Sequence, residues 1–230
     1  MKEEKRKIDI TSSLGEKALE FLQQSLTDPL KEGTGIITDK IEYFRFKNKV
    51  TILLKAKEFL KSKGIKTPKK APIKDLTTLL AYSSFEDNEK MQDKWSSLLA
   101  NTLNPKNTYN SCHLFSQILN QLSINEIDIL NYLYGISFFM NSDDRPYRDK
   151  SNLIKKGNQG YELGLIFIDN LSRLKLIEEE PPKLKVKKDN PTFGLSVFDN
   201  DEIDYENFTE STNSFRLSKF GQALIDQINF

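Results

Sequence analysis

The chain contains one cysteine, one histidine and one tryptophan in 230 residues. A single Cys, Cys112, cannot form an internal disulfide and is typical of a reducing compartment. A single His, His113, argues against a histidine-based metal site and against catalysis by a pair of histidines. With only 10 Gly and 8 Pro, the composition is not that of a loop-dominated or disordered chain.

Long apolar runs are also missing. No stretch approaches the roughly 18–20 continuous apolar residues of a membrane span, and the charged start MKEEKRKIDI lacks the apolar centre of a signal peptide. We therefore expect a cytoplasmic protein without a membrane span. No glycine-rich phosphate loop is present either. Together with the single Cys and the single His, this leads us to expect no cofactor, no metal site, no catalytic residue and no enzymatic activity.

Cys112 and His113 are the pair that most resembles catalytic machinery. Neighbouring residues on a helix point about 100° apart, whereas a thiolate–imidazole pair needs hydrogen-bond contact. We interpret Cys112 as a residue at a helix start and His113 as a surface residue. In the segment SDDRPYRD (142–149), Arg side chains are interleaved with the Asp side chains. We therefore expect a solvated, self-paired loop there and not a divalent-cation site.

The charge is nearly balanced overall, with 34 basic and 33 acidic side chains, but it is unevenly distributed. Residues 1–110 carry 21 basic and 15 acidic side chains, whereas residues 111–230 carry 13 and 18. We expect the two parts either to bind different partners or to attract each other. An acidic insert at about 182–213 has six acidic residues between Asp199 and Glu210, and it could bind a basic partner, mask a basic surface or stay disordered.

The strongest local bias lies between residues 40 and 74, where twelve basic residues accompany two acidic ones, Glu42 and Glu58. Side chains that neutralise phosphates release counterions and make binding salt-dependent. This stretch is therefore a candidate surface for nucleic acid or another polyanion; alternatively, it is a solvated helix face. The candidate residues are Arg45, Lys47, Lys49, Lys55, Lys57, Lys61, Lys63, Lys66, Lys69, Lys70 and Lys74.

Helical periodicity dominates the first part of the chain. After a charged lead-in at residues 1–10, it predicts helices over about 11–26, 36–64, 76–83 and 88–105. These helices predict a helical bundle over residues 11–107.

The only Trp lies in the last of these helices. Its apolar face is predicted to contain Met91, Trp95, Leu98, Leu99 and Thr102. Large apolar residues at this spacing usually face a core, so we interpret Trp95 as a buried anchor and not as part of a binding site.

The pattern changes after residue 110. Ser123 followed by Glu126 is a capping-box signature for a helix start. A later helix is predicted from Tyr161, with its inward residues at Leu163, Ile166, Phe167, Asn170, Leu171 and Leu174. A strand-like exit, the acidic insert, a short strand over Phe215–Leu217 and a last helix follow.

This order resembles a winged-helix module over residues 111–230. Ser218 would cap the last helix, and Gly221 would allow close packing. In a DNA-binding winged helix the third helix carries Arg and Lys. Here that helix offers only Arg173, opposed by Glu162 and Asp169, so we interpret the module as a protein-interaction or dimerisation element.

Three segments resemble the abortive infection alpha (Abi-alpha) family of bacterial proteins, over roughly residues 30–230. The first is TDKIEYFRFKNKVTILLKAKEFL, with Arg45 and Asn48. The second is DLTTLLAYSSFEDNEKMQDKWSSLLANTLNP, with Glu86 and Trp95. The third pairs QILNQLSINEIDIL with LSRLKLIEEE…FRLSKFGQAL. The WSSLLA block is the most specific, although the family pattern has Ala after the Trp. The resemblance implies a mostly helical protein associated with phage defence and implies no catalytic residue.

We therefore expect a mainly α fold, with an N-terminal helical bundle and a C-terminal winged-helix-like domain that contains a small β-hairpin. We expect a non-enzymatic phage-defence protein that acts by binding macromolecules. Two alternatives remain open: a nucleic-acid-binding protein that uses residues 40–74, and an interaction adaptor outside defence. A protein partner or self-association is expected, and nucleic acid is a further candidate partner.

Overall fold

A computed structural model gives the fold of the chain, and it describes residues 17, 20, 21, 24, 40–108, 111–137, 145–157, 160–184, 209–210 and 212–229. The chain divides into two compact units. Unit 1 consists of Met1–Ile127 with Gln222–Phe230, and unit 2 consists of Asp128–Gly221. The lead-in at residues 1–10 and most of the acidic insert lie outside the described residues, and the boundary predicted between residues 107 and 111 stays a prediction.

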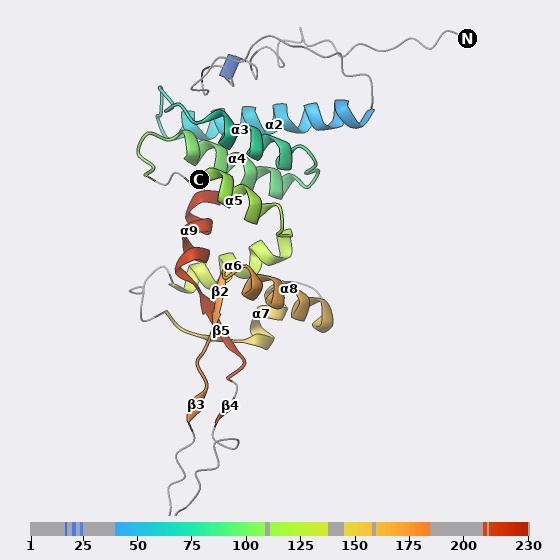
Figure 1. Ribbon diagram of the computed structural model, residues 1–230, viewed down its shortest axis with the longest axis vertical. Helices are drawn as coiled ribbons and strands as arrows, with labels where there is room; N and C mark the ends of the chain where they lie inside the picture. Colours follow the sequence, from blue (N-terminus) through green and yellow to red (C-terminus); the bar gives the residue numbers. More distant parts are fainter. Residues whose placement is uncertain are drawn as a thin grey trace, which may run out of the picture. The chain divides into compact units, whose positions relative to one another are not determined.

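Unit 1 is built from helices α2 (Lys40–Ser62), α3 (Ile73–Ser83), α4 (Glu89–Leu103) and α5 (Cys112–Leu119), with the first residues of α6 (Ile124–Ser137) and most of α9 (Lys219–Ile228) (Figure 1). Helix α2 packs against α4, and α3 packs against α5. No helix in the described ranges combines the length and apolarity of a bilayer span. From residue 40 onward the helices of this unit follow the predicted periodicity, whereas the helix predicted over about 11–26 lies almost entirely outside the described residues.

Trp95 lies in the core of unit 1 and is 2% exposed, which confirms its role as a buried anchor. Helix α4 is capped by Asn88, whose side chain accepts a hydrogen bond from the Met91 N–H at 3.1 Å. The polar residues Gln92 and Ser96 of α4 are buried as well. Helix α4 is therefore enclosed on several sides and not only on its apolar face.

Unit 2 contains a three-stranded antiparallel sheet in the order β1 (Arg148–Asp149), β5 (Ser214–Leu217), β2 (Ile177–Glu179). Ile177 lies opposite Leu217, and Arg148 lies opposite Phe215. Helices α7 (Lys150–Lys156) and α8 (Tyr161–Arg173) pack together beside this sheet, and β3 (Lys183–Leu184) pairs with β4 (Thr209–Glu210) (Figure 1). The described residues therefore confirm a mainly helical fold with a small β component.

The turn before α9 has the capping arrangement that its sequence predicts. The Ser218 hydroxyl accepts a hydrogen bond from the Gly221 N–H at 2.8 Å and donates one to the Lys175 carbonyl at 2.6 Å. A Cβ atom at Gly221 would lie 2.1 Å from the Leu176 carbonyl oxygen. Gly221 is therefore required for the close approach of α9 to the segment before β2.

The start of α6 confirms the capping box. The Glu126 carboxylate accepts a hydrogen bond from the Ser123 N–H at 2.7 Å, and the Glu126 N–H donates one to the Ser123 hydroxyl at 3.4 Å. Reciprocal bonds of this kind satisfy N–H groups that the first helical turn leaves unpaired.

The predicted inward face of α8 is wrong at Leu163 and Ile166, which are 44% and 60% exposed. The buried residues of α8 are Gly164, Ile168 and Leu171. The physical reason lies at Gly164, where an added Cβ would lie 2.6 Å from Cγ2 of Ile154 on α7. Helix α8 docks through its smallest residue, and this rotates its larger apolar side chains toward solvent.

Candidate functional site

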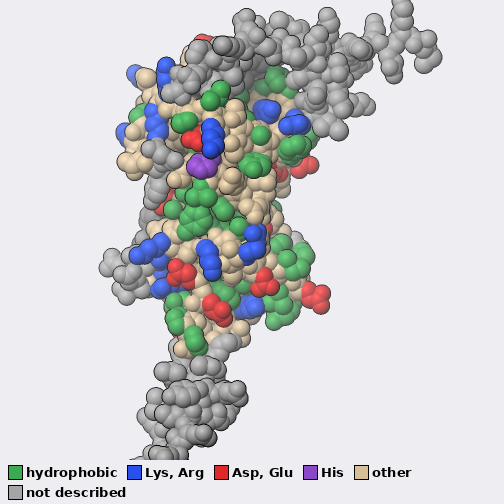
Figure 2. Space-filling model, in the orientation of Figure 1, with side chains coloured by type: hydrophobic (Ala, Val, Ile, Leu, Met, Phe, Trp, Pro, Cys, Tyr) green, Lys and Arg blue, Asp and Glu red, His purple; other side chains and the backbone are tan. Residues whose placement is uncertain are grey.

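The eleven candidate cations lie on α2, on the connection from α2 to α3, and at the start of α3. Seven of them are exposed: Lys47, Lys57, Lys61, Lys63, Lys66, Lys70 and Lys74. We call these seven residues the lysine surface. The opposite side of α2 is buried through Ile52, Ala56 and Leu60. On the face that Figure 2 shows, Lys and Arg side chains are spread over unit 1 and not gathered in one spot.

Lys55 and Lys69 make specific contacts within unit 1. The Lys55 ammonium lies 2.7 Å from a carboxylate oxygen of Asp93 and 4.0 Å from one of Glu89, so it links α2 to α4. The Lys69 ammonium donates a hydrogen bond to the Asn107 carbonyl at 2.8 Å. These two cations hold parts of the fold together.

Arg45 contacts the turn between α3 and α4. Its Nε donates a hydrogen bond to the Ser84 hydroxyl at 3.2 Å, and its guanidinium lies 4.5 Å from the ring centroid of Phe85. Phe85 remains 64% exposed. A guanidinium at this distance from an aromatic ring makes a cation–π contact, so one exposed ring is held beside one cation.

A buried amide network fixes the same turn. The Asn48 side chain donates to the Ser84 carbonyl at 3.1 Å, and the Gln92 side chain donates to the Glu86 carbonyl at 2.9 Å. Gln92 also donates to the Asn48 side-chain oxygen at 3.4 Å. Buried amides that satisfy one another in this way rigidify the backbone that they contact. The turn that presents Phe85 is therefore held in place from α2 and from α4.

Lys49 is close enough to Arg45 for their charges to interact. Burial is the larger cause that lowers the pKa of Lys49, and the charge of Arg45 lowers this pKa further. Neither side chain forms an ion pair with a carboxylate among the described residues. Arg45 is therefore the cation that lies against the exposed ring, and Lys49 lies one helical turn further along α2.

Residues from two separate segments of the sequence thus meet at one turn, and a family comparison covers both segments. A family model described as Abortive infection alpha matches residues 41–228. The chain belongs to the Abortive infection alpha family. This confirms the resemblance noted in the sequence, and the family's name links it to abortive infection. No curated protein and no solved structure gives a significant match.

Of the residues that carry the Abi-alpha resemblance, Arg45 and Asn48 contact this turn and Glu86 lies in it. Sequence reasoning did not bring them together, because Asn48 and Ser84 are 36 residues apart. The signal in the sequence that could have pointed to this turn is the resemblance itself, which includes Arg45 and Asn48 in its first segment and Glu86 in its second. Trp95, which also carries the resemblance, lies in the core and not at this turn.

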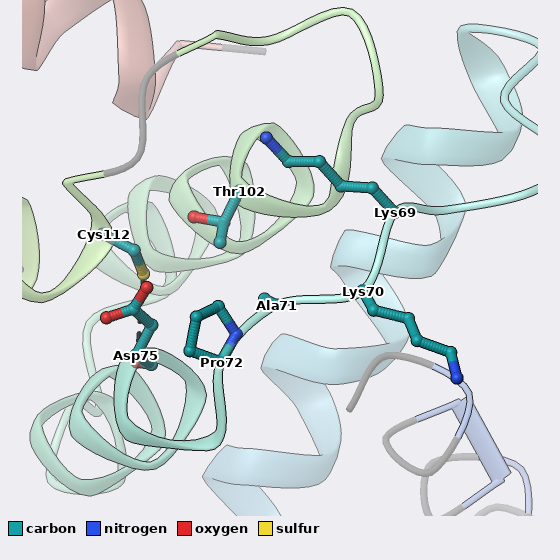
Figure 3. Close-up of a pocket in the computed structure, with 7 residues that line it drawn as sticks. All are labelled: Lys69, Lys70, Ala71, Pro72, Asp75, Thr102 and Cys112. Atoms are coloured by element: carbon teal, nitrogen blue, oxygen red, sulfur yellow. Dashed lines mark hydrogen bonds between the residues drawn. The ribbon is translucent and has the colours of Figure 1, made fainter. Parts of the chain in front are cut away.

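A small pocket of about 80 Å³ lies elsewhere in unit 1 of this Abi-alpha chain. Its lining residues are Lys69, Lys70, Ala71, Pro72, Asp75, Thr102 and Cys112 (Figure 3). The side chain of Lys70 points away from the other lining side chains in Figure 3. The pocket has room for little more than a few water molecules.

Cys112 and His113 do not form a pair, as their adjacent positions predict. His113 Nδ1 lies 3.6 Å from a carboxylate oxygen of Asp75, whereas Cys112 Sγ lies 3.9 Å from the Asp75 carbonyl and from the Ser116 hydroxyl. Burial raises the pKa of the Cys112 thiol to about 11. The thiol is therefore protonated at neutral pH, and a protonated thiol is a poor nucleophile.

The prediction of a solvated loop over residues 142–149 is wrong at Arg145, which is 3% exposed. Residues 142–144 lie outside the described ranges. Asp149 caps α7 by accepting a hydrogen bond from the Ser151 N–H at 2.8 Å. A hydrogen bond from the Ser151 side chain is the largest cause that lowers the pKa of Asp149. Asp149 therefore serves the start of α7.

The outward face of α8 combines apolar and acidic side chains. Leu163 and Ile166 are exposed, as are Glu162 and Asp169. Figure 2 shows hydrophobic side chains gathered over this helix with acidic side chains among them. Arg173, the basic residue predicted in this helix, donates a hydrogen bond to the Asn170 side chain at 2.7 Å.

Proposed function

We propose that this Abi-alpha chain acts in abortive infection as a binding protein without enzymatic activity, and that the lysine surface contacts a polyanion. The observation that carries the proposal is the density of exposed lysines along the sequence. Six of the seven lie between residues 57 and 74, where Glu58 is the only acidic residue. Lysines at such density release counterions when they meet phosphates.

The chemistry of Cys112 and His113 supports a binding role. The thiol is buried and protonated, and the imidazole contacts Asp75 instead of the sulfur. A nucleophile needs an adjacent base, and this pair does not supply one.

The test is retention on heparin and on DNA at about 0.1 M salt. The triple variant Lys61→Glu, Lys66→Glu, Lys70→Glu should lose retention, because it reverses three charges of the lysine surface. A matched control is Lys90→Glu, Lys106→Glu, Lys155→Glu, which changes the net charge equally at exposed positions elsewhere. Equal losses in the two triple variants would dismiss a localised surface, and the absence of retention by the wild type would dismiss the function.

We further propose that unit 2 is a winged-helix module. The order α6, β1, α7, α8, β2, β5, with β5 between the other two strands, supports this assignment. In such a module α8 takes the place of the DNA-reading helix. Its outward face presents Ile166 and Leu163 beside Glu162 and Asp169.

That face of α8 fits a protein and not DNA. Acidic side chains repel phosphates, whereas exposed apolar ones gain from burial in a protein interface. The partner that complements it is a protein segment with apolar side chains flanked by Lys or Arg. Ile166→Asp should abolish protection in a phage plaque assay without weakening retention on heparin. Full protection by this variant would overturn the role of α8.

A further inference from the structure

We propose that the turn between α3 and α4 is a stacking site for a base of single-stranded nucleic acid, with Phe85 as the platform. This inference rests on the proposed polyanion function and names the class of ligand. Phe85 is 64% exposed, although burial of an aromatic ring is strongly favourable. The hydrogen bonds of the turn explain why the Phe85 ring is held in an exposed position.

The backbone of the turn is anchored on both sides of Phe85. The Phe85 N–H donates to the Tyr82 carbonyl at 3.3 Å, and the Ser84 carbonyl accepts from Asn48 at 3.1 Å. Gln92 holds the Glu86 carbonyl at 2.9 Å. The ring is thus presented by a rigid turn, and a rigid platform loses little entropy when a ligand stacks on it.

The cation beside the ring provides a contact for an anionic ligand. Arg45 lies over the ring at 4.5 Å, and Lys49 lies one helical turn further along α2. A flat apolar ring with a guanidinium over one face fits a nucleotide, because the base stacks on the ring and the phosphate meets the guanidinium. A base within a duplex has both of its faces covered by its neighbours, so the ligand must be single-stranded.

Two acidic residues, Glu86 and Asp87, follow Phe85 directly in the chain. The Glu86 carboxylate accepts a hydrogen bond from the Asn88 N–H at 2.9 Å. Asp87 is exposed. Since its charge opposes a phosphate, Asp87→Asn should tighten binding.

The site and the lysine surface share α2. Arg45 and Lys61 are sixteen residues apart on this helix, which corresponds to a rise of about 24 Å. Lys47 and Lys57 lie between them and are exposed. At 100° per residue, however, Lys47, Lys57 and Lys61 lie about 120–160° around the helix from Arg45. The stacking site and the lysine surface are therefore two separate contacts for a strand, on different sides of α2.

The experiment measures filter binding of a labelled oligothymidylate of about 12 nucleotides, with heparin binding measured in parallel. Phe85→Ala should weaken oligonucleotide binding about tenfold and leave heparin binding unchanged. Phe85→Tyr should bind as the wild type does, and Phe85→Leu should weaken binding because it keeps the bulk but removes the ring. Tyr161→Ala is the matched control, since Tyr161 is 65% exposed and lies in unit 2.

The outcomes separate the two proposals. If the wild type binds heparin and oligothymidylate, and Phe85→Ala binds both equally well, the stacking site is overturned and the polyanion function stands. If the wild type binds heparin but not the oligonucleotide, the choice of ligand is overturned alone. If the wild type binds neither, both proposals fail. The native melting temperature of each variant should match the wild type, because the substituted side chains are exposed.

Discussion

Lys55 on α2 and Asp93 on α4 form an ion pair at 2.7 Å across the most extensive helix contact of unit 1. Glu89 lies one helical turn before Asp93, with its carboxylate 4.0 Å from the same ammonium. The sequence predicts Lys55 only as one of eleven candidate cations for polyanion binding and does not indicate these ion pairs. Charge reversal at Lys55 would place three carboxylates together, so its effects on binding and on folding could not be separated.

Lys55→Glu should therefore lower the free energy of unfolding by about 0.5–1 kcal/mol, a modest effect because the pair is partly exposed. Urea denaturation measures this change. Lys47→Glu on the same helix should leave stability unchanged, since Lys47 is exposed and does not lie in the last turn of α2. Equal stabilities of the two variants would show that the Lys55 pair contributes nothing to the helix contact.

Gly221 offers a sharper test of packing. Gly221→Ala should destabilise the protein by about 1–3 kcal/mol, because the added methyl group would collide with the Leu176 carbonyl. The matched control is Gly135→Ala in α6, where a Cβ meets nothing within 4 Å. That substitution should stabilise the protein by about 0.5–1 kcal/mol. Opposite signs are expected in thermal unfolding, and a shared sign would contradict the packing of α9 described above.

The register of α8 is tested by two isoleucines two residues apart. Ile168 is fully buried and Ile166 is 60% exposed. Ile168→Asp should destabilise the protein by several kcal/mol, since it buries an unpaired charge. Ile166→Asp should change stability by less than about 0.5 kcal/mol. If Ile166→Asp proved the more damaging substitution, the face predicted from periodicity would be the correct one.

Cys112 predicts a dependence of stability on alkaline pH. Burial raises its pKa from 9.0 to about 11, so the folded state retains a proton that the unfolded chain loses first. The stabilising contribution is complete below pH 9 and is lost as the pH rises toward 11, with a slope of at most about 1.4 kcal/mol per pH unit. Urea denaturation from pH 8 to 11 measures it. Cys112→Ser should flatten this profile, and an unchanged slope would assign the effect to other groups.

Local signals in the sequence were sufficient for several parts of the fold. The capping box of Ser123 and Glu126, and the Ser218–Gly221 turn, each depend on residues within three positions of one another. The burial of Trp95 follows from the spacing of apolar residues along one helix. In these cases the interacting groups are neighbours in the chain, so their geometry is set by the helix itself.

The remaining features depend on contacts between distant segments. The outward rotation of α8 is decided by Ile154 filling the space at Gly164. The inward face predicted from periodicity is set by the large apolar residues of a helix and takes no account of glycine. The Arg45–Phe85 contact joins α2 to the turn between α3 and α4, across 40 positions of the sequence. Such pairings depend on which helices pack together, and a single sequence does not specify that.

The enclosed indole of Trp95 makes the two units distinguishable in solution. All tryptophan emission from this chain arises in α4 of unit 1, because Trp95 is the only Trp, and it is 2% exposed. Its emission should therefore lie at short wavelength in the native state and shift to longer wavelength only when unit 1 opens. Unit 2 contributes no tryptophan fluorescence. A comparison of the fluorescence shift with the loss of the circular-dichroism signal would therefore reveal whether the units unfold together or one after the other.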